Sequence, residues 1–233
     1  MAAARIEELQ KLLRERGLGK ALPKLEAPAL PAAPTGRVEL DRRLGGGLPR
    51  GAVSELIGPE SSGRTSLLLG ALAQATAADE LVAYVDATDA LDPRSALAAG
   101  VTLERMLWVR CEARQPERWR RALRQAPAES AWQAANLVAA AGGFGVVAVD
   151  LGGLSIQRLE QWRRLPWVRL RQAVEHGSTA LVVLAERHVA GSAATLTLDL
   201  ERESGARGVL LADVADVRVH VRQHRAARQR LTA

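Results

Sequence analysis

A glycine-rich loop between an apolar run and a helical pattern constrains this chain more than any other feature. The loop reads Gly58-Pro59-Glu60-Ser61-Ser62-Gly63-Arg64-Thr65 and follows the apolar run of residues 53–57. It fits the phosphate-binding pattern G-x-x-x-x-G-K-[ST] at every fixed position but one, because Arg64 stands where the pattern has lysine. In such a loop the glycines let backbone N–H groups turn toward a phosphate, and the following helix adds its positive end.

Three residues decide what this loop can bind. Arg64 keeps a positive charge, but a guanidinium is larger than an ammonium and directs its donors differently. Thr65 is the residue that ligates Mg²⁺ in this pattern. Asp150 closes the apolar run of residues 146–149, where an acidic residue holds the magnesium shell through water. We therefore predict a weak or vestigial nucleotide site in residues 58–65 and Asp150, with ATP or ADP and Mg²⁺ as candidate ligands.

Three segments resemble bacterial RecA recombinases. The loop has the Gly-Pro-Glu-Ser-Ser-Gly form that is typical of RecA, and residues 35–51 resemble the segment that leads into the RecA core. Residues 84–93 read Y-V-D-A-T-D-A-L-D-P, which is similar to the RecA run I-D-A-E-H-A-L-D-P. This resemblance implies a RecA-like α/β core with a mainly parallel central sheet flanked by helices.

The specific match to RecA covers residues 35 to about 110, and three further features look most like the ImuA family, RecA-like accessory proteins of a damage-inducible mutagenesis cassette that are related to the SulA superfamily. The features are the length of 233 residues, the missing lysine and a second half rich in arginine and tryptophan. The resemblance implies a non-catalytic role in the SOS response and in translesion synthesis. The implied partners are RecA, a Y-family-like polymerase homologue and the replicative-type polymerase of the same cassette. A DNA-dependent ATPase of the RecA type and a SulA-like inhibitor of cell division remain the alternatives.

Positions that correspond to RecA's catalytic machinery carry different residues. The residue that resembles the catalytic glutamate is Thr88, and a hydroxyl cannot act as a carboxylate base at neutral pH. The position that resembles the glutamine sensor is Glu186, and residues 187–208 lack the Gly-Gly-Asn pattern of the mobile DNA-binding loop. We therefore predict no catalytic residue and no efficient hydrolysis.

The amino-terminal region predicts a tethered helix. Residues 1–17 place Ile6, Leu9 and Leu13 on one helical stripe, and residues 18–34 contain four prolines, which indicates a linker. Such a helix either folds back on its own core or docks on another protein. Because RecA grips its filament neighbour with an amino-terminal helix, the resemblance favours docking on RecA, on a polymerase-like partner or on a second copy. The core is predicted over residues 35–223 and a basic tail over 224–233.

Alternation of apolar strands with helices predicts a parallel sheet in the core. The strands are expected at residues 53–57, 81–86, 106–109, 146–150 and 182–185, and the helices at 65–78, 94–100, 116–125 and 128–141, with one helical stretch over 155–175. Residues 195–201 and 217–222 alternate strictly between apolar and polar, which predicts an antiparallel edge.

Arginine and tryptophan crowd together in two places. The 32 basic residues outnumber the 26 acidic ones, and the net charge of +6 favours nucleic acid or an acidic protein as partner. Mixtures of Arg and Trp occur in single-strand binders and in protein hot spots, but a basic helix with its tryptophan turned inward gives the same pattern. The candidate contacts for a partner protein or single-stranded DNA are Arg118, Trp119, Arg121, Arg163, Trp167 and Arg169.

Other features exclude several classes of protein. Cys111 is the single cysteine, so the chain has no internal disulfide, and the four histidines show no metal-site spacing. The longest uncharged run, residues 131–149, contains three glycines and predicts a helix and a buried strand instead of a membrane span. Residues 1–4 run straight into a charged helical pattern, unlike a signal peptide. We expect a cytoplasmic protein without a metal centre or membrane contact.

Overall fold

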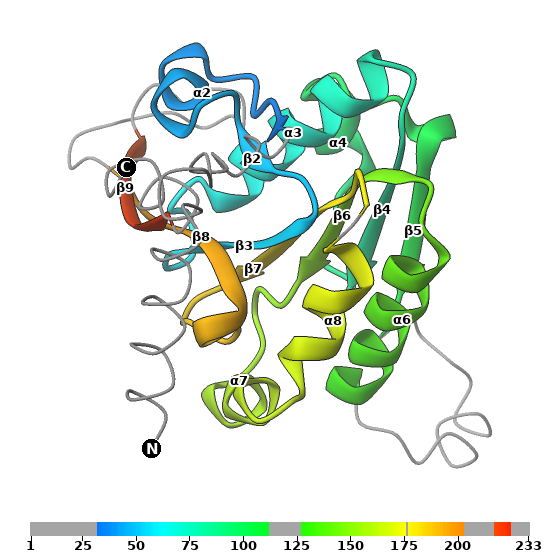
Figure 1. Cartoon of the computed structure of the whole chain (residues 1–233), viewed down its shortest axis with the longest axis vertical. Coiled ribbons are helices and arrows are strands. Elements are labelled where there is room, and N and C mark those ends of the chain that lie inside the picture. Colours follow the sequence, from blue (N-terminus) through cyan, green and yellow to red (C-terminus); the bar gives the residue numbers. More distant parts are fainter. Residues whose placement is uncertain (1–31, 112–126, 176, 203–216, 225–233) are drawn as a thin grey trace, which may run out of the picture. The chain divides into compact units, whose positions relative to one another are not determined.

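A seven-stranded sheet organises the computed structural model of the chain (Figure 1). The structure describes residues 32–111, 127–175, 177–202 and 217–224. The strand order is β5-β4-β6-β7-β3-β8-β9, in which neighbouring strands run parallel except for the antiparallel pair β8–β9. A separate two-stranded sheet joins β1 and β2. The predicted parallel sheet and its antiparallel carboxyl-terminal edge are thus confirmed.

The strands of the described residues are β1 (Ala32–Ala33), β2 (Leu48–Pro49), β3 (Ala52–Ile57), β4 (Leu81–Asp86), β5 (Met106–Arg110), β6 (Phe144–Asp150), β7 (Ala180–Ala185), β8 (Ala194–Arg202) and β9 (Val217–His224). The helices are α2 (Val38–Leu44), α3 (Arg64–Ala77), α4 (Pro93–Ala98), α6 (Pro127–Ala141), α7 (Ile156–Arg163) and α8 (Trp167–Val174), with short 3₁₀ turns η2 (Leu103–Arg105) and η3 (Gly191–Ala193).

Helices cover both faces of the large sheet, and each face has its own apolar cluster. One cluster joins the sheet to α2, α3 and α4, and includes Leu40, Leu68 and Ala96. The other joins it to α6, α7 and α8, which lie together on the opposite face in Figure 1. The central strands β3 and β7 are buried at every residue, because helices shield them from both sides.

Two boundaries differ from the sequence prediction. The helical stretch predicted over residues 155–175 is two helices, because Pro166 has no N–H to donate and disfavours a helical conformation at the residue before it. Ala32 and Ala33 lie inside the predicted linker, but they pair with β2. The predicted helices at residues 1–17 and 116–125 lie outside the described residues, as does the tail beyond residue 224.

Helix α2 was absent from the prediction. Its amino-terminal approach is held by Asp41, whose carboxylate accepts hydrogen bonds from the backbone N–H and the hydroxyl of Thr35 at 2.9 and 2.7 Å. The helix ends at Gly45, which adopts the left-handed conformation with φ 77°. Residues 35–51, which resemble the segment before the RecA core, therefore contain a helix that packs Leu40 and Leu44 into the core.

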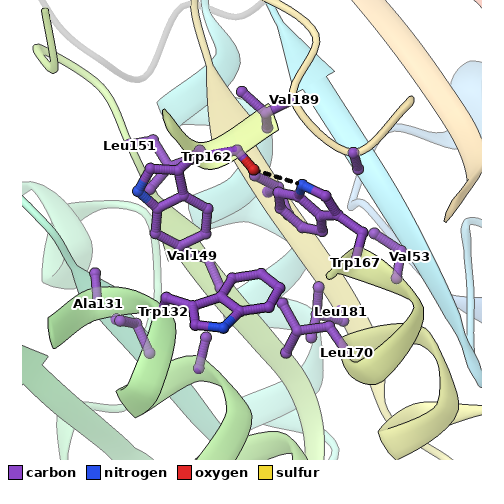
Figure 2. Packing of buried hydrophobic residues seen from close by; sticks show 14 of the residues in the cluster. Val53, Ala131, Trp132, Val149, Leu151, Trp162, Trp167, Leu170, Leu181 and Val189 are labelled. Carbon is purple, nitrogen blue, oxygen red and sulfur yellow. Dashed lines mark hydrogen bonds between the residues drawn. The ribbon is translucent and has the colours of Figure 1, made fainter. Parts of the chain in front are cut away.

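Three tryptophans pack together beneath the sheet (Figure 2). Trp132 of α6 meets Trp162 of α7 and Trp167 of α8 edge to face, with ring centroids 5.5 and 5.3 Å apart. The indole N–H of Trp167 donates to the carbonyl of Trp162 at 2.9 Å, the bond drawn in Figure 2. The prediction of Trp167 as a contact residue is therefore corrected: its ring fills the core, while Arg163 and Arg169 remain exposed. Arg118, Trp119 and Arg121 lie outside the described residues.

Candidate nucleotide site

A cavity of about 750 Å³ opens where the loop after β3 faces the carboxyl ends of β4 and β6. Ligand sites of parallel α/β sheets form at this end of the strands. Of the residues predicted for a nucleotide site, Glu60 to Thr65 and Asp150 line this cavity, whereas Gly58 and Pro59 do not. Its other lining residues are Ser66, Leu69, Tyr84, Thr88, Ala90, Leu91, Asp92, Ser95, Gly152, Gly153, Arg202 and Val217.

The loop has backbone geometry that requires glycine. Gly63 caps α3 with φ 88°, and a Cβ at this position would lie 2.3 Å from a methyl group of Val217. A Cβ at Gly58 would lie 2.5 Å from the hydroxyl oxygen of Ser62. That hydroxyl is buried and has no hydrogen-bond partner among the described residues. The loop therefore offers to the cavity a buried hydroxyl and the start of a helix that has no side-chain hydrogen bond from its N-cap.

Arg64 folds into the protein and does not extend into solvent. Its side chain is only 8% exposed. The guanidinium donates to the carbonyl of Gly58, and its Nη2 lies 3.8 Å from a carboxylate oxygen of Glu186. These partners follow β3 and β7, so Arg64 bridges the ends of two adjacent strands.

Asp150 is bonded at both carboxylate oxygens by protein donors. The hydroxyl of Tyr84 donates to Oδ2 at 2.5 Å, and the N–H of Gly152 donates to Oδ1 at 2.8 Å. Burial raises the pKa of Asp150 above its ordinary value, although both hydrogen bonds act in the opposite direction. Burial, followed by the nearby Asp150 charge, raises the pKa of the Tyr84 hydroxyl well above its ordinary value. The raised pKa of Tyr84 keeps its hydroxyl protonated, which is the form that donates to Asp150.

Three more polar residues near the site, Thr88, Asp86 and Asp89, have partners within the protein. The hydroxyl of Thr88 donates to the carbonyl of Gly152 at 2.9 Å. Asp86 is fully buried and accepts hydrogen bonds from the N–H groups of Ala90 and Leu91, each at 3.0 Å. Arg110 pairs with both carboxylate oxygens of Asp89 at 2.6 and 2.7 Å. Neither Asp86 nor Asp89 lines the cavity.

Sequence reasoning missed two contributors to the site. Tyr84 looked like one of several apolar strand residues, and only the pairing of β4 with β6 places it beside Asp150. Asp92 caps α4 by accepting from the N–H groups of Arg94 and Ser95, and it lines the cavity as well. The Asp92-Pro93 pair, a capping residue before a proline at the first helical position, was the available signal.

The described residues contain no group of three histidine, cysteine or acidic side chains that could hold a metal ion. They also contain no helix that is long and apolar enough to cross a membrane. The loop itself fits a nucleotide phosphate, because residues 61–65 line the cavity with the start of α3 and with the Ser62 hydroxyl, which has no hydrogen-bond partner among the described residues.

A parallel α/β sheet with a glycine loop leading into α3 defines the P-loop class of nucleotide-site architecture. Within that class, residues 5–143 match the family model described as the RecA N-terminal domain, and the chain belongs to this family. The fold is accordingly that of a RecA-like core.

Comparison with individual proteins agrees with this assignment. Protein RecA of Frankia alni is 37% identical over 134 residues, which is 57% of this chain and 35% of that protein. Protein RecA of Salinispora arenicola is 36% identical over 155 residues, or 65% of this chain and 40% of that protein. Protein RecA of Cutibacterium acnes is 44% identical over 102 residues, or 42% of this chain and 29% of that protein. The match thus spans well under half the length of these relatives.

Proposed function

We propose that this chain is a RecA-like accessory protein that does not turn over nucleotide and acts through protein partners in the DNA damage response. The observation that carries the proposal is the set of internal contacts at the nucleotide site. Arg64 bonds to Gly58 and lies near Glu186, and Thr88 bonds to Gly152. Phosphoryl transfer needs a group that orients the attacking water and cations that steady the transferred phosphate. Thr88 has no carboxylate to orient the water, and the guanidinium of Arg64 is already bonded to Gly58 and partly offset by Glu186.

Two chemical arguments support the absence of turnover. Thr88 occupies the position that resembles the catalytic glutamate, and its hydroxyl is a poor base as well as already hydrogen-bonded. The nearby carboxylates of Asp86 and Asp89 have other hydrogen-bond partners and do not line the cavity. The resemblance to ImuA adds the proposed setting, which is damage-induced translesion synthesis.

The proposed partners are RecA, a Y-family-like polymerase homologue and the replicative-type polymerase of the same cassette. A RecA-like core without turnover would cap or disturb a RecA filament by occupying a subunit position in it. The proposed docking element is the apolar stripe of Ile6, Leu9 and Leu13. The same stripe is the proposed contact between two copies of this chain. The exposed Arg163 and Arg169 are the proposed contacts for single-stranded DNA.

The docking proposal is tested in the full-length chain by introducing charge into the stripe. Leu9→Asp with Leu13→Asp should abolish capture of purified RecA or of the polymerase homologues, because a charge cannot enter an apolar groove. Leu137→Asp is the matched control, since Leu137 is 73% exposed on α6. Retention of every interaction by the double variant would refute the docking role.

Phosphate release tests the absence of turnover. The chain is incubated with ATP and Mg²⁺, with and without single-stranded DNA, and release is expected to stay at background. Release that rises with DNA and falls on Thr65→Ala would replace this proposal with a DNA-dependent ATPase. Binding to the tubulin-like division protein, without binding to RecA, would favour the SulA-like inhibitor.

A further inference from the structure

We propose that the cavity binds a nucleoside diphosphate without magnesium, with Arg64 as its resident cation, and that it disfavours the triphosphate. This inference names the ligand of the same site and so rests on the proposed non-catalytic function. Three features of the cavity support it: an anion-binding loop, an arginine near Asp150 and an excess of carboxylates in the lining.

The cradle is ready for an oxyanion. Helix α3 runs for 14 residues, and its cap Gly63 supplies no side-chain hydrogen bond to the first turn. The N–H groups there are orphan donors with the positive end of the helix dipole behind them. The hydroxyl of Ser62 is buried, lines the same cavity and has no partner among the described residues. A phosphate oxygen would satisfy this hydroxyl together with the backbone donors.

The Arg64 guanidinium lies near Asp150, the carboxylate that would hold a metal shell through water. A Cβ built on Gly152 would lie 3.0 Å from Oδ1 of Asp150 and 3.2 Å from Nη2 of Arg64, so both groups lie next to Gly152. Asp150 accepts from Tyr84 and from Gly152, one donor on each oxygen. A hydrated Mg²⁺ would share the carboxylate with these donors and would have to approach a fixed positive charge. Arg64 therefore supplies the charge that a metal supplies in other phosphate loops.

The charge balance favours the ligand with fewer negative charges. The ionisable lining consists of the carboxylates Glu60, Asp92 and Asp150 and the guanidinium groups of Arg64 and Arg202. Glu186 offsets part of the Arg64 charge from a distance of 3.8 Å. A triphosphate adds about one further negative charge to this lining, and with no metal to offset it the electrostatic cost rises. The apolar side chains of Leu69, Leu91 and Val217 give the nucleoside a nonpolar wall.

Titration of the full-length chain with ADP and with ATP, each in EDTA and in excess Mg²⁺, tests the proposal. The dissociation constant for ADP should agree within about twofold between EDTA and Mg²⁺, and in EDTA ATP should bind at least about fivefold more weakly than ADP. Binding of ADP only with Mg²⁺, or equal affinity for ATP in EDTA, would overturn the proposal. So would the absence of any ADP binding.

Two variants and one control test whether Arg64 determines the affinity for ADP. Arg64→Gln should weaken ADP at least about tenfold, whereas Arg43→Gln, which removes an exposed charge on α2, should leave it unchanged. Glu186→Gln should tighten ADP by about two- to fivefold, because the guanidinium loses a competing carboxylate. A gain in affinity cannot result from misfolding, so an unchanged or weaker affinity in Glu186→Gln contradicts the role of Arg64.

The two proposals fail separately. Phosphate release and partner capture test the proposed accessory function. The titrations test the proposed binding of ADP without magnesium. A chain that captures RecA but binds no ADP keeps the first proposal and loses the second. A chain that releases phosphate in the presence of DNA loses the first, whatever its affinity for ADP.

Discussion

At the residue scale, the site is defined by side chains that bond to one another across strands. Tyr84 of β4 reaches Asp150 of β6, and Arg64 of α3 reaches Gly58 at the end of β3. Each of these groups is buried, so each depends on its partner more than a surface residue would. The sequence identified Arg64 and Asp150 from a motif, whereas their partners became visible only with the strand order.

Tyr84→Phe isolates one of these bonds. The change removes only the hydroxyl that donates to Asp150 at 2.5 Å and leaves a buried oxygen without that donor. The free energy of unfolding should fall by about 1–3 kcal/mol, measured by urea denaturation. Ser178→Ala, at an exposed position, is the control and should change it by less than about 0.5 kcal/mol. Equal stability of Tyr84→Phe and wild type would show that the bond is not stabilising.

At the scale of elements, pattern predicted the strands better than the helices. The apolar runs of β6 and β7 are short, almost wholly buried and bounded by polar or glycine residues, so their composition and length located them. The break between α7 and α8 was missed although Pro166 marks it. Glu55 illustrates a limit of local reasoning: its carboxylate accepts from the N–H groups of Val189 and Ala190, both at 2.8 Å, and no local pattern predicts a contact across that separation.

The tryptophan cluster gives a prediction about the α6–α7–α8 layer. Trp167→Ala should lower the free energy of unfolding by about 3–5 kcal/mol, because the ring packs against Trp132 and Trp162 in the core. Arg169→Ala, two residues away and exposed, should change it by no more than about 0.5 kcal/mol. Thermal denaturation followed by circular dichroism compares the two variants. Similar losses in both would contradict an inward-facing Trp167.

The cap of α4 predicts a dependence on pH. The Ser95 hydroxyl, followed by the N–H of Arg94, holds the pKa of Asp92 below its ordinary value of 3.8. Ionised Asp92 therefore stabilises the folded state above pH 3.8, and this contribution is lost as the pH falls through the lowered pKa. Asp92→Asn still caps the helix but does not titrate. The stability advantage of wild type over this variant should shrink as the pH falls below 3.8 in urea titrations, and a constant difference would contradict it.

At the scale of the whole molecule, the seven-stranded sheet contributes residues to two apolar clusters, one on each face. Residues on alternate sides of β6, such as Val147 and Val146, belong to different clusters, so neither layer can separate without exposing the sheet. Parallel order and helices on both faces were predictable from the alternation of patterns. The motif residues of the site could be predicted because they are recognisable in the sequence. Tyr84, Gly152 and Val217 could not, because only the folded chain brings them to the same cavity.

The shared sheet predicts cooperative unfolding of the described core. Tryptophan fluorescence reports mainly on the α6–α7–α8 layer through Trp132, Trp162 and Trp167, and far-UV circular dichroism reports on all helices. The two signals should give the same urea midpoint in one transition. Separate midpoints would show that the two layers unfold independently.

The contact between Val217 and Gly63 sets an order of events during translation. The phosphate loop is made before β9, the strand that brings Val217 against Gly63. Until then the nascent sheet ends at β8 with an unpaired edge, and the loop lacks one wall of its cavity. A chain that stalls before residue 217 would therefore present to chaperones and proteases an open strand edge beside an uncovered loop.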